Sequence, residues 1–386
     1  MSSMEIPFNK PYIVSNELDY LKQAHATGHL SGDGLFTKKC HAWLEETVGC
    51  QKAFLTQSCT AALEMAAILI DTQATDEIIM PSFTFVSTAN PFVLRGGVPV
   101  FVDIRSDTLN IDETKIEAAI TLKTKAIVVV HYAGVSCEMD SIMALAEKYN
   151  LFVIEDAAQG IMSSYKGRPL GSIGHLSAYS FHETKNIISG EGGALLINDS
   201  RFIKRAEIIR DKGTNRGQFS RGMVDKYTWI DVGSSFLPNE LTAAFLFAQM
   251  KNADNITQRR IAIWEYYHTA FAILEKKKVL RRPIIPSQCQ FNGHIYYLLL
   301  NSIEQRSEFI IQAERCGIHP VFHYIPLHNS LAGKKYGRSH GNLSVTNQLA
   351  NCIVRLPLWL GIEAFLEDVV CKLVSILKAI DLIGEK

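Results

Sequence analysis

The sequence has no excess of either charge, because 39 lysine and arginine residues balance 39 aspartate and glutamate residues. Proteins that bind nucleic acid or anionic membranes normally carry a basic face, so this balance favours neither class of partner. Apolar runs long enough to span a bilayer are also missing, and the first residues, MSSMEIPFNKP, lack the basic and apolar regions of a secretory signal. We therefore expect a cytoplasmic protein that neither inserts into membranes nor binds nucleic acid.

Cysteine pairs with the CxxC spacing are absent as well. The eight cysteines are scattered along the chain between Cys40 and Cys371. Such scatter is typical of buried thiols in a reducing compartment. We expect no disulfide framework and no metal site.

Short apolar runs rich in β-branched residues alternate with amphipathic stretches in the first half of the chain. The runs at 98–104, 126–132 and 151–157 predict strands, and the stretches at 112–124 and 137–150 predict helices. Unbroken apolar strands must be buried on both faces, so the pattern predicts a mostly parallel sheet covered by helices.

A long helical pattern at 238–276 separates this half from a different arrangement of strands and helices. Pro238 suits the first turn of such a helix. We expect an α/β protein with a large domain over residues 1–250 and a small C-terminal α+β domain over residues 251–386.

The stretch LTQSCTAALEMAAILI, residues 55–70, begins a helix with hydroxyl side chains. Ser58 could simply cap the helix, but free N–H groups at a helix start also bind phosphate. A Walker loop is absent, and SGDGLFT lacks the third glycine of a dinucleotide fingerprint. A small cofactor with one phosphate therefore fits better than ATP or NAD.

Two further stretches carry residues suited to such a cofactor. LFVIEDAAQ ends a strand with Glu155 and Asp156, and either acid could cap the next turn or hold a proton on a heterocyclic nitrogen. In PSFTFVSTANPF, Phe83 is expected in the core, whereas Phe85 could lie flat against a cofactor ring.

Lys185 stands between a short polar run and a glycine-rich turn, in SFHETKNIISGEGG. Alone, it is typical of a solvated lysine. Together with the strand-end acid and the helix start, it indicates a pyridoxal 5'-phosphate site, in which Lys185 holds the aldehyde covalently and Asp156 pairs with the ring nitrogen. Ser180 and the helix end at Thr60 and Ala61 would hold the phosphate.

The motifs SFHETKNIISGEGG, IEDAAQ, PSFTFVSTAN and FHYIPLH resemble those of the DegT/DnrJ/EryC1/StrS family of nucleotide-sugar aminotransferases, over essentially the whole chain. The resemblance implies the aspartate aminotransferase-like fold type I, with a seven-stranded, mostly parallel sheet in the large domain. It also implies an obligate homodimer with shared active sites.

By motif, the resemblance implies the same role for Lys185 as the covalent anchor and for Asp156 at the ring nitrogen. It adds Gln159 near the ring hydroxyl and repeats the assignments of the other residues, which are Phe85 for ring stacking and Ser180, Thr60 and Ala61 for the phosphate. Many members carry an asparagine that reaches the phosphate from the partner subunit. VGSSFLPNE places Ser235 at that position, so Ser235 is a further candidate.

Within the family, SGDGLFTKKCHAWLE and KGTNRGQFSRGMVDKYTW are similar to members that aminate dTDP-4-dehydro-6-deoxy-D-glucose with L-glutamate, for surface polysaccharides such as enterobacterial common antigen. Candidate substrate-binding residues are Asp33, Tyr324, His328 and, from the partner subunit, Lys226 and Tyr227. Tyr324, His328 and the adjacent His323 could equally be surface loop residues. The alternatives are a family enzyme that gives the C4 epimer or a 3-amino sugar, and a non-catalytic regulator with the same fold.

Overall fold

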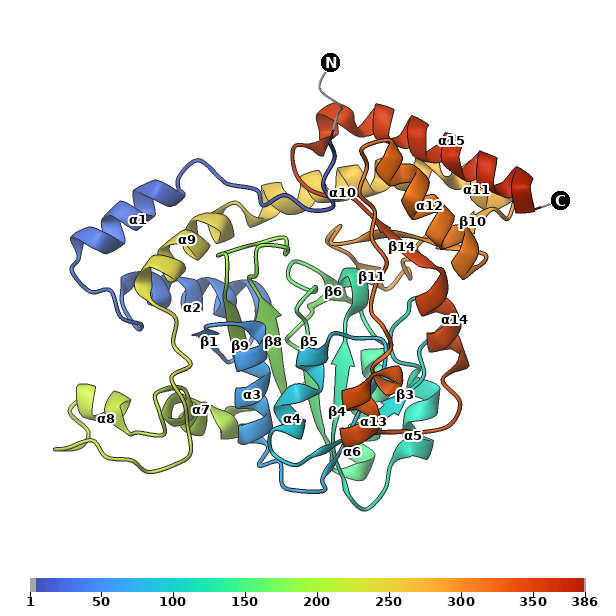
Figure 1. Cartoon of the computed structure of the whole chain (residues 1–386). Coiled ribbons are helices and arrows are strands. Elements are labelled where there is room, and N and C mark those ends of the chain that lie inside the picture. The colour runs from blue at the N-terminus through green and yellow to red at the C-terminus, as the bar shows by residue number, and fades with distance from the viewer. Residues whose placement is uncertain (1–4, 385–386) are drawn as a thin grey trace.

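The computed structural model describes residues 5–384, and Figure 1 shows a central sheet with helices packed around it. The strands of this sheet are β1 (Lys52–Thr56), β9 (Gly193–Ile197), β8 (Leu176–Ser180), β5 (Phe152–Asp156), β4 (Thr124–Val130), β2 (Glu77–Pro81), β3 (Val98–Val102) and β13 (Arg338–Ser339), in that spatial order. β9 is antiparallel to both of its neighbours, and the other pairings are parallel. The sheet is therefore mostly parallel, as the sequence predicts, with β13 added as an eighth strand.

Both faces of this sheet are buried, because successive strand residues enter different apolar clusters. In β4, Ala126 and Val128 pack in the cluster of α3 (Cys59–Leu69), whereas Ile127 and Val129 pack in the cluster of α6 (Met139–Tyr149). This two-sided burial explains why the strands are apolar throughout rather than at alternate positions.

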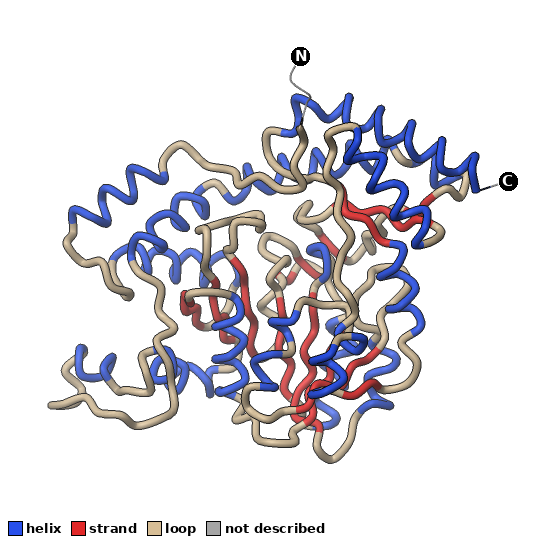
Figure 2. The backbone as a smooth tube through the Cα atoms, viewed as in Figure 1, coloured by secondary structure: helices blue, strands red, loops and turns tan. Residues whose placement is uncertain are grey.

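The other helices surround this core (Figure 2). The α-helices are α1 (Glu17–Ala26), α2 (Leu35–Val48), α4 (Asn90–Val93), α5 (Ile116–Ala119), α7 (Ile203–Arg210), α8 (Arg216–Ser220), α9 (Glu240–Lys251), α10 (Ala253–Ala270), α11 (Ala272–Lys276), α12 (Ile303–Arg315), α13 (Leu331–Tyr336), α14 (Ser344–Cys352) and α15 (Leu366–Gly384). The short 3-10 helices are η1 (Val86–Thr88), η2 (Glu113–Lys115), η3 (Tyr132–Gly134), η4 (Ser200–Phe202), η5 (Leu327–Asn329) and η6 (Ile362–Phe365). Among the helices of residues 5–384, none is long and apolar enough to cross a membrane.

The last third of the chain forms a small antiparallel sheet of β10 (Leu280–Arg281), β12 (Tyr296–Leu300) and β14 (Ile353–Leu356). α12 and α15 pack beside it at the upper right of Figure 1. The start of the described chain joins this part, since Ile6 pairs with Ile318. A third sheet consists of β11 (Cys289–Gln290), β6 (Ser164–Tyr165) and β7 (Arg168–Pro169).

The three predicted strands are confirmed to within two residues at each end. The helix predicted over 112–124 is confirmed only over 113–119, as η2 and α5, because Ile120 is already extended and Thr124 begins β4. The region 238–276 forms three helices, and the first begins after Pro238, with Asn239 as its N-cap. The prediction of buried cysteines is wrong for Cys316 and Cys371, which are exposed.

The start of α2 depends on a residue that is distant in sequence. Gly34, the N-cap of α2, has no side chain to bind the free N–H groups. The buried carboxylate of Glu240 accepts hydrogen bonds from the N–H groups of Phe36, at 2.7 Å, and Thr37, at 3.0 Å, and from the Thr37 hydroxyl. Glu240 thus joins α9 to α2.

We expect Glu240→Ala to lower the free energy of unfolding by about 2 kcal/mol, because it leaves buried donors without acceptors. Urea unfolding followed by circular dichroism measures this change. Glu314→Ala, on the exposed face of α12, is the control and should shift stability by less than about 0.5 kcal/mol. Equal shifts in the two variants would contradict the capping role of Glu240.

Candidate active site

The candidate site lies where neighbouring strands of the main sheet end. β5 ends at Asp156 and the adjacent β8 ends at Ser180, and both strands run parallel to β4. Lys185 follows β8 after a turn in which its N–H bonds to the carbonyl of His182, at 2.9 Å. Ligands of open α/β sheets bind outside the carboxyl ends of the strands, so these residues occupy the expected edge.

Asp156 is a buried carboxylate, with 6% of its surface exposed. Thr88 donates a hydrogen bond to its Oδ2 at 2.7 Å, and the N–H of Ala158 donates one to Oδ1 at 3.2 Å. Burial raises the pKa of Asp156, although Thr88, Ala158 and the charge of Lys185 oppose the shift. A carboxylate has about four acceptor positions, so Asp156 retains capacity for a cationic N–H donor.

The adjacent Glu155 has a structural role. Its carboxylate lies 2.8 Å from Nε2 of His131 and accepts hydrogen bonds from the N–H groups of Gly171, Ile173 and Gly174, at 2.6–2.9 Å. Burial opposes ionisation, but these donors outweigh it and hold the pKa of Glu155 below its usual value. Of the two acids left open by the sequence, Asp156 is the one with acceptor capacity to spare.

The amine of Lys185 has a lowered pKa and no hydrogen-bond partner among residues 5–384. Loss of hydration lowers its pKa, whereas the charge of Asp156 opposes this shift. Within residues 5–384, Nζ forms no hydrogen bond or ion pair. The following residue, Asn186, is buried and fixed, because its Oδ1 lies 2.8 Å from Nδ1 of His294 and its Nδ2 donates to the carbonyl of Asn292 at 2.9 Å. The backbone is therefore held while the amine stays free.

The start of α3 lies beside these groups, since the charges of both Asp156 and Lys185 act on the thiol of Cys59. Ser58 caps the helix, with Oγ accepting from the N–H of Ala61 at 3.1 Å. The predicted cap is thus confirmed, and it occupies the Ala61 N–H that was also expected at the phosphate.

The phosphate candidates extend beyond α3. Thr60 Oγ1 donates to Ser87 Oγ at 2.8 Å, which adds Ser87 to the predicted set. The hydroxyl of Ser180 is buried and lies 3.5 Å from the His182 nitrogen. At Gly193 an added Cβ would meet the backbone of Ser58 and Cys59, so only glycine allows this approach of β9 to α3.

Aromatic residues form one wall of the site. Phe85 keeps 57% of its surface exposed, and its ring centroid lies 6.4 Å from that of Tyr324, whereas Phe83 is buried as expected. Tyr324 accepts a hydrogen bond from Nε2 of Gln159 at 3.2 Å, and the centroid of its ring lies 3.6 Å from that of His323. His323 is buried, so the surface-loop interpretation is wrong for this residue.

These contacts suit pyridoxal 5'-phosphate. An exposed aromatic face is available for stacking, a buried carboxylate has capacity for a protonated ring nitrogen, and an unpaired lysine amine is available for covalent attachment. Among the described residues, no cluster of histidine, cysteine, aspartate or glutamate suited to a metal ion occurs.

Other candidates have partners elsewhere in the chain. Asp33 pairs with Arg210 at 2.5 Å, and Nδ1 of His328 lies 2.6 Å from Oγ of Ser82, at the end of β2. Ser235 is exposed, and its carbonyl accepts from Nε2 of Gln57 at 2.8 Å.

Lys226 and Tyr227 lie on a segment that the structure places apart from the strand ends. The segment 211–235, which includes α8, extends from the body at the lower left of Figure 1. Antiparallel β-bridges between Asp211 and Ser235 and between Thr214 and Trp229 join the two ends of the segment. Within one chain, Lys226 and Tyr227 are therefore not brought to Lys185.

Sequence reasoning missed Ser87, Thr88, His294 and Asn186 as parts of the site. Three of them stood in the quoted motifs PSFTFVSTAN and SFHETKN. Their roles depend on contacts with residues far away in sequence, which no local spacing reveals.

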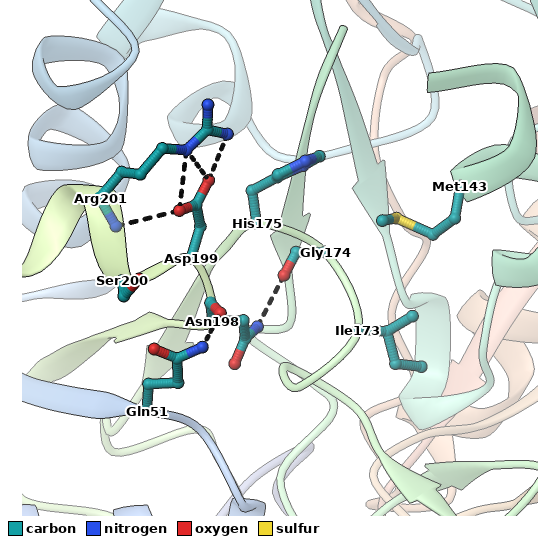
Figure 3. A pocket seen from close by; sticks show the side chains of 9 residues that line it. All are labelled: Gln51, Met143, Ile173, Gly174, His175, Asn198, Asp199, Ser200 and Arg201. Atoms are coloured by element: carbon teal, nitrogen blue, oxygen red, sulfur yellow. Dashed lines mark hydrogen bonds and ion pairs between the residues drawn. The ribbon is translucent and has the colours of Figure 1, made fainter. Parts of the chain in front are cut away.

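A separate pocket of about 370 Å³ lies at the opposite edge of the sheet (Figure 3). Its lining includes His175, just before β8, and Asn198, just after the antiparallel β9. Asn198 and the ion-paired Asp199 and Arg201 are bonded within the pocket wall. The pocket contains neither Lys185 nor Asp156, so it is not the site described above.

The model of the DegT/DnrJ/EryC1/StrS aminotransferase family matches residues 11–375. An uncharacterized protein of Methanocaldococcus jannaschii is 34% identical over 330 residues, which cover 84% of this chain and 85% of that protein. The spore coat polysaccharide biosynthesis protein SpsC of Bacillus subtilis is 32% identical over 385 residues, which cover 97% and 98%.

Solved structures match over nearly the whole chain. Spr1654 of Streptococcus pneumoniae, named a sugar aminotransferase and solved in its PMP form, has a TM-score of 0.91 at 24% identity and covers 99% of this chain and 100% of its own. An aminotransferase from Psychrobacter cryohalolentis has a TM-score of 0.89 at 27% identity and covers 97% and 100%. The fold is that of the type I aminotransferases, which confirms the predicted fold class. The chain belongs to the DegT/DnrJ/EryC1/StrS aminotransferase family.

The opposite pKa shifts of the two adjacent acids predict opposite effects of neutralisation in the cofactor-free protein. A carboxyl group whose pKa is lowered on folding adds stability above its unfolded pKa, and that stability is lost as the pH falls through the folded value. Glu155→Gln should therefore cost about 2 kcal/mol at neutral pH, and the difference from the parent should shrink as the pH falls below the usual glutamate value.

Asp156→Asn is the matched comparison, and here the expected change in stability has the opposite sign. Because burial raises the pKa of Asp156, its charge opposes folding at neutral pH, and the variant should be as stable as the parent or more so. Urea unfolding across a pH series measures both. A loss in Asp156→Asn as large as that in Glu155→Gln would show that Asp156 is a structural acid.

Proposed function

We propose that this protein is a pyridoxal 5'-phosphate-dependent sugar aminotransferase, specifically a dTDP-4-amino-4,6-dideoxygalactose transaminase. It transfers the amino group of L-glutamate to C4 of dTDP-4-dehydro-6-deoxy-D-glucose. The products are dTDP-4-amino-4,6-dideoxy-D-galactose and 2-oxoglutarate. The observation that carries the proposal is the free amine of Lys185, with its lowered pKa, near the buried carboxylate of Asp156.

Each residue then has a defined task. When bound, pyridoxal 5'-phosphate supplies an aldehyde that carries the amino group and a ring that accepts an electron pair. Asp156 keeps the ring nitrogen protonated, and Phe85 supports the ring face. Lys185 Nζ would hold the aldehyde and, as a free amine, would remove the proton from the carbon that bears the amino group. The lowered pKa of Lys185 favours the neutral amine that proton removal needs.

The phosphate would be bound by N–H groups at the start of α3 and by hydroxyl groups of α3, η1 and the end of β8. Thr60, Ser87 and Ser180 supply the hydroxyls, and the first N–H groups of the helix have no partner within it. Gln159, held by Tyr324, contributes near the ring hydroxyl.

The family and its named members support a nucleotide sugar as the class of substrate. SpsC is named for polysaccharide biosynthesis, and Spr1654 is named a sugar aminotransferase. The finer assignment to the 4-amino galacto product depends on the resemblance of SGDGLFTKKCHAWLE and KGTNRGQFSRGMVDKYTW. Asp33, Tyr324 and His328 remain candidates for binding the sugar nucleotide.

The active form is a homodimer in which each chain completes the site of the other. The segment 211–235 supports this, because it extends from the body and exposes large apolar side chains, with Trp229 at 78% and Tyr227 at 54%. A second copy of the chain would bury these side chains. Lys226, Tyr227 and Ser235 of the first copy would then lie near the cofactor bound by the second copy.

Lys185→Ala should lose the visible absorbance of the covalently attached cofactor and lower the transamination rate by about 10²- to 10⁴-fold or more, because the same amine anchors and moves the proton. The visible spectrum and turnover with L-glutamate measure this. Lys148→Ala, which removes a surface lysine paired with Glu117, should match the parent. Full turnover in Lys185→Ala would refute the mechanism.

The product itself tests the substrate assignment. The purified protein, with L-glutamate and dTDP-4-dehydro-6-deoxy-D-glucose, should give an axial amine at C4, read from the proton couplings in the NMR spectrum. An equatorial amine would assign the C4 epimer, and amination at C3 of a related keto-sugar would assign a 3-aminotransferase.

A further inference from the structure

Residues 292–295, just before β12, contact loops that follow strands of the main sheet. Nδ2 of Asn292 donates hydrogen bonds to the carbonyls of Gln159, at 2.8 Å, and Ile161, at 2.7 Å, in the loop after β5. The approach is close, because a Cβ added at Gly134 in η3 would lie 2.2 Å from Oδ1 of Asn292. The segment 292–295 therefore packs against the edge of the sheet that carries the candidate site.

Helix α10 holds this segment from the other side. Arg260 is buried, and its Nε and Nη2 donate to the carbonyls of Gly293, at 3.2 Å, and His294, at 2.9 Å. Trp264, one turn further along α10, donates to the carbonyl of Ile295 at 3.1 Å. Gly293 has a φ of 62°, and a Cβ there would meet the backbone of Arg260 at 2.7 Å. The backbone on both sides of His294 is therefore fixed.

The side chain of His294 reaches the loop that carries Lys185. Its Nδ1 lies 2.8 Å from Oδ1 of Asn186, the residue after Lys185. Nδ2 of Asn186 donates to the carbonyl of Asn292 at 2.9 Å, so the other atom of this amide, Oδ1, is an acceptor. Nδ1 of His294 must therefore carry the proton of its hydrogen bond to Asn186.

His294 is a neutral imidazole at neutral pH. Burial lowers its pKa well below the usual value, and the charges of Lys185, Arg260 and Arg355 add to this shift. Because the charge of Lys185 acts on the ring, the two side chains are close. His294 thus brings no charge to the lysine, but a hydrogen bond to the residue beside it.

The loop 181–192, here called the lysine loop, otherwise bonds mostly to itself. The N–H of Lys185 bonds to the carbonyl of His182 at 2.9 Å, and the N–H of Glu183 bonds to the carbonyl of Gly190 at 2.8 Å. Through its side chain, Asn186 joins this loop to the segment 292–295.

We propose that His294 is a positioning residue for Lys185, because its Nδ1–H bond to Asn186 holds the lysine loop in one orientation. This inference depends on the proposed function. The segment 292–295 also bonds to the loop of Gln159, which we assign to the ring hydroxyl, so it sets the amine of Lys185 relative to the ring. A misplacement of about 1 Å at a reacting group costs about 10²-fold in rate.

Two substitutions separate the two ring nitrogens. His294→Asn places its amide nitrogen near the position of Nδ1 and keeps a donor for Asn186, whereas the longer side chain of His294→Gln places its amide near the position of Nε2. Asn186→Ala removes the acceptor instead. The matched control is His268→Asn, because His268 stacks on Trp264, with ring centroids 4.5 Å apart, but within residues 5–384 makes no bond to the lysine loop.

Hydrogen exchange of the cofactor-free protein, followed by mass spectrometry, measures how firmly the lysine loop is held. Peptides that span residues 181–190 should exchange about 10-fold faster in His294→Gln and in Asn186→Ala than in the parent, because the bond between the loop and the segment is lost. His294→Asn and His268→Asn should exchange within about threefold of the parent.

The holoenzyme gives two further readouts. In His294→Gln, kcat should fall about 10- to 100-fold while KM for L-glutamate stays within about twofold, because the amine is misplaced and binding is kept. The visible circular dichroism of each bound cofactor, which reports the orientation of ring and lysine, should fall in the same variant. Asn186→Ala should reproduce these losses, and His294→Asn should recover both quantities.

Parent values in both His294 variants, or equal losses in His294→Asn and His294→Gln, would overturn the role of the Nδ1–H bond. A lower kcat in His294→Gln without faster exchange would also overturn it, because the rate would then depend on Nε2 or on the ring. The exchange measurement needs no turnover. A parent that converted its cofactor with neither L-glutamate nor keto-sugar would refute the proposed function, whereas unchanged exchange in His294→Gln would refute this inference alone.

Discussion

The buried carboxylate of Asp156 is the constraint on which the site depends. A charge out of water is unfavourable unless donors surround it, and within residues 5–384 only Thr88 and the N–H of Ala158 donate to this carboxylate. The remaining acceptor capacity faces the region of Lys185 and α3. Thr88 is itself held by Thr84, 2.7 Å away, so the loop after β2 is organised around this one acid. The protein thus holds a negative charge ready at a fixed position, at a cost that a cationic ring nitrogen would offset.

The neighbouring acid shows how one strand serves two purposes. Glu155 and Asp156 point to opposite faces because side chains alternate along β5. Glu155 joins His131 to the loop of Gly171, Ile173 and Gly174, and so fixes the start of β8. Asp156 faces the strand ends near Lys185. Glu155, which has the structural role, is fully paired, whereas Asp156, the acid that we propose for the cofactor, is not.

Much of this could be predicted from the sequence. The apolar runs located the central strands, and the residues that follow them, Asp156 and Lys185, located the edge where the site lies. Ser58 was identifiable because a helix cap has a local signature.

The remaining contacts had no such signature. His294 and Thr88 contact residues far away in the chain, and Glu240 caps a helix about 200 positions earlier. The helix predicted over 112–124 ends early, at Ala119, for a related reason, since the chain must then reach Thr124, where β4 pairs with β2. The ion pair of Asp33 could not be predicted from sequence spacing either, because its partner, Arg210, lies far along the chain at the end of α7.

The short strand β13 has a consequence for how the chain is made. It pairs with β3, and Arg338 binds the carboxylate of Glu77 at the start of β2 through two hydrogen bonds of 2.8 Å. Until residue 339 has left the ribosome, the edge of β3 has no covering strand, although the rest of the main sheet has long been synthesised. An open edge invites pairing with other chains. The two residues of β13 therefore cover this edge of the sheet only late in synthesis.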